Sequence, residues 1–378
     1  MKILFTVIFL DGFHGSVIHI KELADYYLHS KKDQFQVEVA TLFVAPEVFL
    51  FYKKSGIKVK LIQEVDINIK YDIVFAYHFP TIDNLLRRGL KCEKLVLNSL
   101  SSFELLEIFP SYWNEASLLV VMSEETRQTH HKKYNIPLDK MLVFENSIPD
   151  SYIDYKSSKE HPKRTPKRIA VVSNHVPPEM RQMAQIAPSE LTIDFFGIGQ
   201  KNYTPIEPEI LDRYDIIISI GKTVQYAIGL GIPAFEYDHF GGNGYITLSN
   251  FNHEATYNFS GRPQRRKLSP HDLLDEITSG YPEAYKQSSQ LKEIGISRFL
   301  LSLKADNLIE SVKHSPTFKG KLDNYILSID HGVSFSQWLS HYKHLAESSS
   351  RRTISYQKII NKSKTILKRC LHVFKLFI

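Results

Sequence analysis

The chain has 378 residues, enough for two domains of ordinary size, and its hydrophobic (43%) and charged (23%) fractions are those of a globular protein. Its two cysteines, Cys92 and Cys370, lie far apart in the sequence, which argues against a disulfide scaffold or a cysteine zinc site and fits a reducing compartment. The net charge is +6, but residues 351–378 carry +8 with no acidic side chain, which leaves −2 for residues 1–350. A nucleic-acid-binding body is therefore not expected.

Residues 1–150 alternate between apolar runs of strand length and amphipathic runs of helical length. We interpret residues 2–10 as a buried strand and not as a secretory signal, because the apolar run stops at Asp11 and no small-residue cleavage site follows. Residues 16–31 then carry apolar side chains at helical spacing. The further strand candidates are 37–44, 58–62, 72–79, 94–100, 117–123 and 141–147. Such alternation predicts a parallel sheet covered on both faces, in a Rossmann-like domain.

The polar, proline-containing stretch 151–167 is expected to be a linker, after which the alternation begins again. A second, smaller doubly wound Rossmann-like domain is predicted over 168–346, with trailing helices in 283–315 and 320–346. Its strand candidates are 168–174, 191–199, 214–221 and 232–237, and its helices are expected around 177–187, 222–230 and 270–279. No run reaches the ~18 apolar residues that a membrane-spanning helix needs.

Polar side chains and glycines concentrate in the loops that follow the predicted strands. In open α/β sheets, ligands bind beyond the carboxyl ends of the strands, so these loops are the candidate binding regions. The loops of the first domain supply Asp11, His14 and His78. Those of the second domain supply His175, Gly197, Asp238, His239, Gly241 and Gly242.

The stretch 219–245 combines a Gly-Lys-Thr sequence with a glycine-rich loop, but its spacing is wrong for a P-loop. We interpret Thr223 as the N-cap of a helix whose free N–H groups, together with the charge of Lys222, attract an anion. Gly241 and Gly242 would let the backbone approach a ligand closely. The alternative is that these glycines only form turns and that the lysine is solvated.

Several segments resemble the GT-B glycosyltransferases, and in particular family-4-like bacterial capsule or lipopolysaccharide transferases. The first helix of that family is similar to HGSVIHIKELADYYL. The strands that close its N-terminal domain are similar to SLLVVMSEETRQ and KMLVFENSIPDSY. Its donor-site helix and the strand after it are similar to GKTVQYAIGLGIPAFEYDHFGG. The resemblance implies two Rossmann-like domains facing a cleft, with the nucleotide-sugar donor mainly on the C-terminal domain and the acceptor on the N-terminal one.

In the donor site that this resemblance implies, Lys222 and Thr223 hold the phosphates, with Gln225 on the same helix and Asp238 and His239 on the strand end that follows. His175 is expected to meet the diphosphate, and Gly197 and Gln200 to border the nucleobase. Retaining members of family 4 usually carry a Glu-x7-Glu pair around this helix. Here the region of the second glutamate reads Thr223-Val224-Gln225, so the retaining mechanism is not carried over.

The catalytic candidates lie in the first domain. Asp11 and His14 occupy the loop where inverting GT-B enzymes often carry a general base for the acceptor hydroxyl, and His78 is the next candidate. A structural role for each histidine is the alternative. No metal motif is present, since the adjacent His130 and His131 of a helix point in different directions. The resemblance implies an enzyme without a bound metal or other cofactor.

The last segment, 347–378, is expected to be a basic amphipathic tail that lies on an anionic membrane surface, with packing on the body as the alternative. We therefore expect a peripheral glycosyltransferase on the cytoplasmic face of the membrane. It would transfer sugar from a nucleotide donor to a glycan acceptor, lipid-linked, in bacterial surface polysaccharide or lipopolysaccharide synthesis. The alternatives are a sugar-nucleotide epimerase of the same fold, which needs no such tail, and a non-catalytic glycan-binding protein, which needs neither Lys222 nor the glycines.

Overall fold

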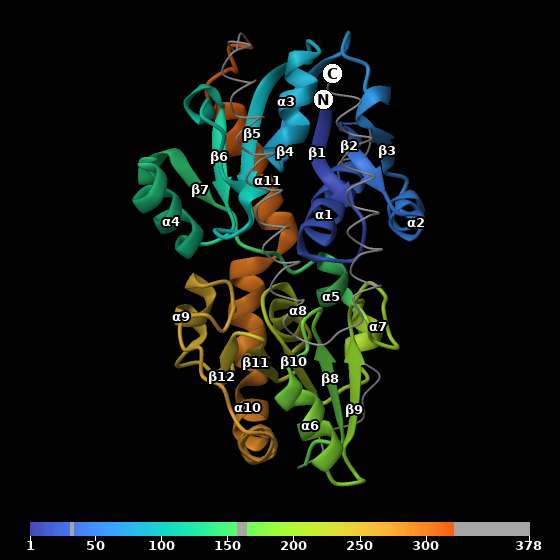
Figure 1. The fold of residues 1–378 in the computed structure, drawn as a ribbon, viewed down its shortest axis with the longest axis vertical. Helices are drawn as coiled ribbons and strands as arrows, with labels where there is room; N and C mark the ends of the chain where they lie inside the picture. Colours follow the sequence, from blue (N-terminus) through green and yellow to red (C-terminus); the bar gives the residue numbers. More distant parts are fainter. Residues whose placement is uncertain (31–33, 157–164, 321–378) are drawn as a thin grey trace, which may run out of the picture. The chain divides into compact units, whose positions relative to one another are not determined.

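The computed structural model describes residues 1–30, 34–156 and 165–320 (Figure 1). In these residues the strands form two sheets, of seven and five strands. The predicted class, α/β with two doubly wound sheets, is confirmed. The tail 347–378 and the helical patterns expected in 321–346 lie outside the described residues, as does the middle of the expected linker, 157–164.

The seven-stranded sheet has the order β3-β2-β1-β4-β5-β6-β7. Pairing is parallel between β1 and β2, β2 and β3, β1 and β4, and β4 and β5, as continuous apolar strands require. The strands are β1 (Lys2–Leu10), β2 (Gln36–Val44), β3 (Lys58–Leu61), β4 (Lys70–Tyr77), β5 (Lys91–Ser99), β6 (Leu118–Val121) and β7 (Met141–Val143). The helices between them are α1 (Gly15–His29), α2 (Pro46–Lys54), α3 (Phe79–Arg87) and α4 (Glu124–Tyr134).

The five-stranded sheet has the order β12-β11-β10-β8-β9, parallel except for β12, which runs antiparallel to β11. Its strands are β8 (Arg168–Val172), β9 (Thr192–Phe196), β10 (Ile216–Ser219), β11 (Ala234–Asp238) and β12 (Gly241–Tyr245). The helices that follow the first sheet are α5 (Asp150–Asp154), α6 (Pro178–Ile186), α7 (Pro208–Leu211), α8 (Lys222–Leu230), α9 (Phe251–Thr256), α10 (Pro270–Phe299) and α11 (Leu301–His314).

Two elements differ from the sequence-based expectation. The segment 241–245, expected to be a glycine-rich loop, is the edge strand β12. The helices expected around 270–279 and 283–315 are instead α10 and α11, which meet at Leu300. The backbone leaves the helical path there because Phe299 O accepts a hydrogen bond from Ile148 N (2.7 Å) and Leu301 N donates one to Ile148 O (2.9 Å).

The chain packs into two compact units. Among the described residues, unit 1 comprises 1–11, 34–120 and 314–320, and unit 2 comprises 12–30, 121–156 and 165–313. Helix α1 therefore belongs to the unit that contains the five-stranded sheet, although it follows the first strand of the chain. The domain boundaries expected at 150 and 168 stay a prediction.

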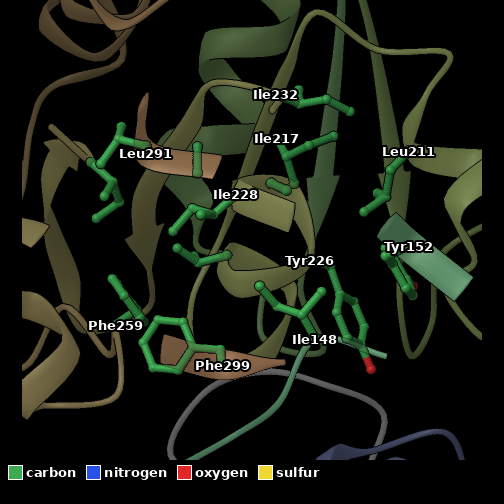
Figure 2. Packing of buried hydrophobic residues seen from close by; sticks show 14 of the residues in the cluster. Ile148, Tyr152, Leu211, Ile217, Tyr226, Ile228, Ile232, Phe259, Leu291 and Phe299 are labelled. Carbon is green, nitrogen blue, oxygen red and sulfur yellow. The ribbon is translucent and has the colours of Figure 1, made fainter. Parts of the chain in front are cut away.

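The core of unit 2 surrounds helix α8, as Figure 2 shows. Val224, Ala227 and Ile228 recur at helical spacing and are buried, which makes the inner face of α8 apolar along its length. The helix ends at Gly231, whose φ of 73° gives a left-handed C-cap. Tyr226 stacks on Tyr152 of α5, with ring centroids 4.4 Å apart. This packing fixes the position of Lys222, the first residue of the helix.

Candidate functional site

Three loops at the carboxyl edge of the five-stranded sheet are joined by hydrogen bonds of short polar side chains. Ser173, after β8, donates from Oγ to Asp238 Oδ1 of β11 (2.9 Å) and accepts from His175 N (2.8 Å). Asn174 Oδ1 accepts from Ile198 N in the loop after β9 (3.0 Å). The loops are thereby held in place as a preformed rim, as a binding site on an open sheet requires.

Two histidines lie on this rim. The rings of His175 and His239 meet edge to face, with centroids 5.0 Å apart. Desolvation and the nearby His239 lower the pKa of His175 from its ordinary value of 6.5, and Asp238 opposes the shift. Asp238 accepts from His239 N (2.7 Å), and His239 Nδ1 lies 3.4 Å from Asp238 Oδ1. His175 is exposed, so its ring is accessible to a ligand.

Gly197 and Gln200 lie in the next loop. Gly197 has a φ of +131°, and a Cβ on it would stand 2.1 Å from the carbonyl oxygen of Ser173, so only glycine fits. Gln200 Oε1 accepts from Arg181 Nη1 (3.3 Å). The structure therefore brings His175, Gly197 and the Asp238–His239 pair to one edge of the sheet, as the sequence predicted.

Gly241 and Gly242 of β12 are required by the close packing of the protein's own backbone. A Cβ on Gly242 would stand 1.8 Å from the carbonyl oxygen of Glu236 on β11, and one on Gly241 would stand 2.4 Å from that of Arg266. The close packing of the protein's own backbone thus explains both glycines. They are no longer an independent sign of a ligand, and their predicted contact with the donor stays a prediction.

Two buried carboxyl groups lie beneath β12. Glu236 and Glu254 are both inaccessible to solvent. Glu236 accepts from Gly261 N, and Glu254 accepts from Asn243 Nδ2 (2.8 Å). Burial, followed by the charge of Glu254 and a hydrogen bond with it, raises the pKa of Glu236 to about 9. Glu236 is therefore expected to keep its proton at neutral pH.

Lys222 does not extend freely into solvent. Its Nζ lies 2.5 Å from Glu22 Oε2 of α1, and the two side chains are only 9% and 11% exposed. The same carboxylate accepts a hydrogen bond from the hydroxyl of Tyr226, one turn along α8. Lys222 Nζ also donates weakly to Ser147 O (3.4 Å). Burial raises the pKa of Glu22, although Lys222 and Tyr226 oppose that shift.

The start of α8 differs from the prediction in one respect. The N-cap is Gly221, with φ 61° and ψ −131°, so Thr223 lies within the first turn and is not the cap. The glycine is used because the chain leaves β10 in a backbone conformation that an L-residue avoids. Gln225 is 1% exposed, and its Oε1 has no hydrogen-bond partner among the described residues. It faces the interior of unit 2.

His14 is the one catalytic candidate that packs in unit 2. It precedes α1, and its Nδ1 lies 3.2 Å from Ser16 Oγ. The neighbouring backbone is held by Tyr203 from the loop after β9, whose hydroxyl accepts from Phe13 N (2.8 Å). A Cβ on Gly12 would stand 2.4 Å from that hydroxyl. The loop that carries His14 therefore lies against a loop of the five-stranded sheet.

Asp11 and His78 belong to unit 1. Asp11 follows β1 and is exposed. His78 follows β4 in a left-handed conformation (φ 56°) and is 8% exposed. Its Nδ1 accepts from Ile8 N and its Nε2 lies near Glu107 Oε1, both at 3.4 Å. Both ring nitrogens thus have partners inside unit 1, which favours the structural alternative for His78.

Within residues 1–30, 34–156 and 165–320, no group of three or more His, Cys, Asp or Glu side chains is arranged to hold a metal ion. His130 is 1% exposed, and burial lowers its pKa to about 4. His131 is exposed and pairs through Nδ1 with Ile136 O (3.0 Å). No helix in the same part of the chain is long and apolar enough to span a bilayer.

The sequence reasoning missed Glu22, Tyr203 and the Glu236–Glu254 pair. An acidic residue among the apolar positions of the first helix was the available signal for Glu22, because a buried carboxylate needs a partner. The same reasoning applies to Glu236, which lies inside the apolar run 232–237. Nothing in the sequence indicates Tyr203, whose role depends on the contact of its loop with Gly12 and Phe13.

Neither a family model nor a curated protein sequence matches the chain. Solved structures match it at low identity over most of its length. HepE of Anabaena, in complex with UDP-glucose, is 14% identical with a TM-score of 0.56, and the match covers 83% of this chain and 99% of that one. A glycosyltransferase of Rickettsia africae ESF-5 is 13% identical with a TM-score of 0.54, over 82% and 97% of the two chains.

A variant of TarM from S. aureus, in complex with fondaparinux, α-GlcNAc-glycerol and UDP, is 11% identical with a TM-score of 0.53, over 82% and 99% of the two chains. At these identities the likeness defines the fold. The chain has the GT-B fold, with two parallel α/β sheets and C-terminal helices, as the resemblance in the sequence implied.

Proposed function

We propose that the chain is a glycosyltransferase that moves a sugar from a nucleotide-sugar donor to a glycan acceptor. The observation that carries the proposal is the GT-B fold that it shares with HepE, determined with UDP-glucose, and with TarM, determined with UDP. The polar rim at the carboxyl edge of the five-stranded sheet supports it, because this edge is where ligands bind in open α/β sheets.

In this proposal the nucleotide diphosphate binds to the rim formed by His175 and His239. The lowered pKa of His175 leaves its ring largely neutral near pH 7, so it binds phosphate by N–H donation. A bound dianion raises that pKa, and donor affinity should therefore increase as the pH falls. Gly197 and Gln200 border the nucleobase. Lys222 reaches a phosphate only by leaving Glu22, so it is a secondary candidate.

His14 is the proposed general base of an inverting transfer. The acceptor hydroxyl gives its proton to the imidazole as its oxygen forms a bond to the anomeric carbon, and the bond from that carbon to the diphosphate breaks. The nucleotide diphosphate leaves with the electron pair. Asp11, three residues earlier, is the alternative base. The proposal requires no bound metal.

We further propose that the acceptor is lipid-linked and belongs to bacterial surface polysaccharide or lipopolysaccharide synthesis. The support is the composition of residues 351–378, which carry eight basic side chains and no acidic one. Such a segment suits a peripheral protein on the inner face of the cytoplasmic membrane, where a lipid-linked glycan is presented.

Calorimetric titration with a panel of nucleotide sugars tests the donor site. The His175→Ala variant should bind the cognate donor about tenfold more weakly, the loss of one charge-assisted or neutral hydrogen bond of ~1.5 kcal/mol. His253→Ala is the matched control, since His253 is an exposed histidine of α9 in the same unit. Equal losses in both variants, or no donor binding at all, would contradict the proposal.

Product analysis separates the two alternatives. A sugar-nucleotide epimerase converts the donor into its epimer without an acceptor, which proton NMR of the nucleotide sugar detects. A non-catalytic glycan-binding protein binds glycan but leaves the donor intact. A transferase releases free nucleotide at a rate that rises when acceptor is added.

A further inference from the structure

Helix α2 presents its large apolar side chains to solvent. Phe49 is 37% exposed and Leu50 is 56% exposed, whereas Val48 and Tyr52 are buried and hold the helix in unit 1. Elsewhere in residues 1–30, 34–156 and 165–320 the exposed large hydrophobic residues occur singly along the sequence. Isolated exposed residues are normal on a protein surface, but an adjacent pair on the outer face of a helix indicates a contact surface.

Lysines lie beside this pair. Lys53 and Lys54 follow Phe49 and Leu50 by four residues each, so each lysine lies one helical turn from an apolar side chain on the same side of α2. Lys58, at the start of the adjacent strand β3, is also exposed. The one acidic residue of α2, Glu47, lies in its first turn, at the end away from these lysines.

The exposed pair Phe49 and Leu50, together with the neighbouring lysines, indicates which kind of partner this surface binds. A protein interface core is depleted of lysine, so a second copy of this chain is a poor match for the surface. A bilayer with anionic lipids suits both features, because apolar side chains enter the interface while long lysine side chains extend to the lipid phosphates. Figure 1 shows α2 beside β3, which places the three lysines and the apolar pair on neighbouring elements of unit 1.

We propose that α2 is a membrane-contact helix, in which Phe49 and Leu50 insert into the interface of an anionic bilayer and Lys53, Lys54 and Lys58 bind lipid phosphates. This surface is distinct from residues 351–378, and the proposal does not depend on the transferase activity. It gives unit 1, the expected acceptor side, its own contact with the membrane.

Co-sedimentation of the full chain with vesicles tests the proposal. The vesicles contain phosphatidylcholine with phosphatidylglycerol, and phosphatidylcholine alone serves as reference. The Lys53→Glu/Lys54→Glu variant should bind the anionic vesicles at least ~25-fold more weakly, since each lysine near such a surface contributes a factor of about five. The Phe49→Ser/Leu50→Ser variant should lose at least about tenfold. The tail is intact in both variants, so its contribution is constant.

Matched controls come from other exposed positions. Leu303 of α11 is 56% exposed, the same as Leu50, and Leu303→Ser should leave vesicle binding unchanged. Lys132 and Lys133 are an exposed adjacent pair at the end of α4, and their double change to Glu removes the same charge. If that control loses as much vesicle binding as the α2 lysine variant, attraction to the anionic vesicles depends on the net charge of the protein and not on α2, and the proposal is overturned.

Two other results would overturn the proposal. One is undiminished vesicle binding by both α2 variants at an unchanged melting temperature. The other is a change of molar mass in light scattering when Phe49 and Leu50 are replaced, which would make the surface an interface between copies of the chain. Persistence of the monomer mass, with binding lost only in the α2 variants, supports the membrane contact.

Discussion

Replacing Lys222 distinguishes a structural ion pair from a phosphate ligand. In the Lys222→Ala variant the carboxylate of Glu22 stays buried between α1 and α8, loses its ion-pair partner and keeps the hydrogen bond from the hydroxyl of Tyr226. If Lys222 only held the donor phosphates, as the resemblance in the sequence implies, the variant would lose donor binding and keep its fold. The structure changes that expectation, because the lysine already has a buried partner, and we expect the variant to lose stability first.

The size of the expected stability loss follows from the burial of both Lys222 and Glu22. Removing one member of a buried ion pair costs about 3–5 kcal/mol, because the remaining charge is left without compensation. For a unit of this size, 1 kcal/mol corresponds to about 2–4 °C in melting temperature, so the expected decrease is roughly 6–20 °C. The loss should shrink in acid, because a Glu22 without its lysine has a further raised pKa and becomes neutral as the pH falls.

The assay is thermal unfolding of the full chain together with calorimetric titration of the donor. A double variant, Lys222→Met with Glu22→Gln, is the matched control, because replacing both charges by neutral groups of similar shape should recover most of the stability. An unchanged melting temperature in Lys222→Ala, combined with a donor affinity at least ~10-fold weaker, would refute the reasoning. That result would restore Lys222 as the phosphate ligand.

The folded-state pKa of Glu236 is raised from 4.5 to about 9, so the unfolding free energy should fall by up to ~1.4 kcal/mol per pH unit between these two values. The Glu236→Gln variant, whose amide can donate a hydrogen bond to Glu254, should flatten this pH dependence in denaturant titrations. His14→Ala should reduce turnover ~10²–10⁴-fold at unchanged donor affinity, and an equal effect confined to Asp11→Ala would transfer the role of base to that residue. Deletion of 351–378 should weaken salt-sensitive binding to anionic vesicles while donor binding persists; undiminished binding would exclude the tail as an anchor.

The strands could be predicted because their physical requirement is local. A parallel strand covered on both faces needs apolar side chains at nearly every position, and residues 2–10, 37–44 and 168–172 satisfy this in their own sequence. Helix α8 was predicted with its observed bounds, 222–230, for a similar reason, since its apolar spacing and Gly231 define it. Strand β12 was not predicted, because a glycine run carries no strand pattern and the pairing with β11 stabilises it.

The candidate site was predicted in its location but not in its contacts. The rule that ligands bind at the carboxyl edge of an open sheet selected His175, Gly197 and the Asp238–His239 pair, and the fold places them together there. The sequence does not specify what a side chain meets once its element is packed. Thr223 was wrongly expected to be the helix N-cap, because the sharp turn at Gly221 takes that position.

The sequence by itself determined the two α/β sheets, most of their strands, and the edge where polar groups gather, because periodicity and composition act over a few neighbouring residues. Only the tertiary structure decided which charges are compensated. Glu22 and Tyr226 are 204 residues apart, and the contact of both Lys222 and Tyr226 with that carboxylate exists only after α1 has packed against α8. A buried charge is stable only beside its partner, and the fold as a whole selects that partner.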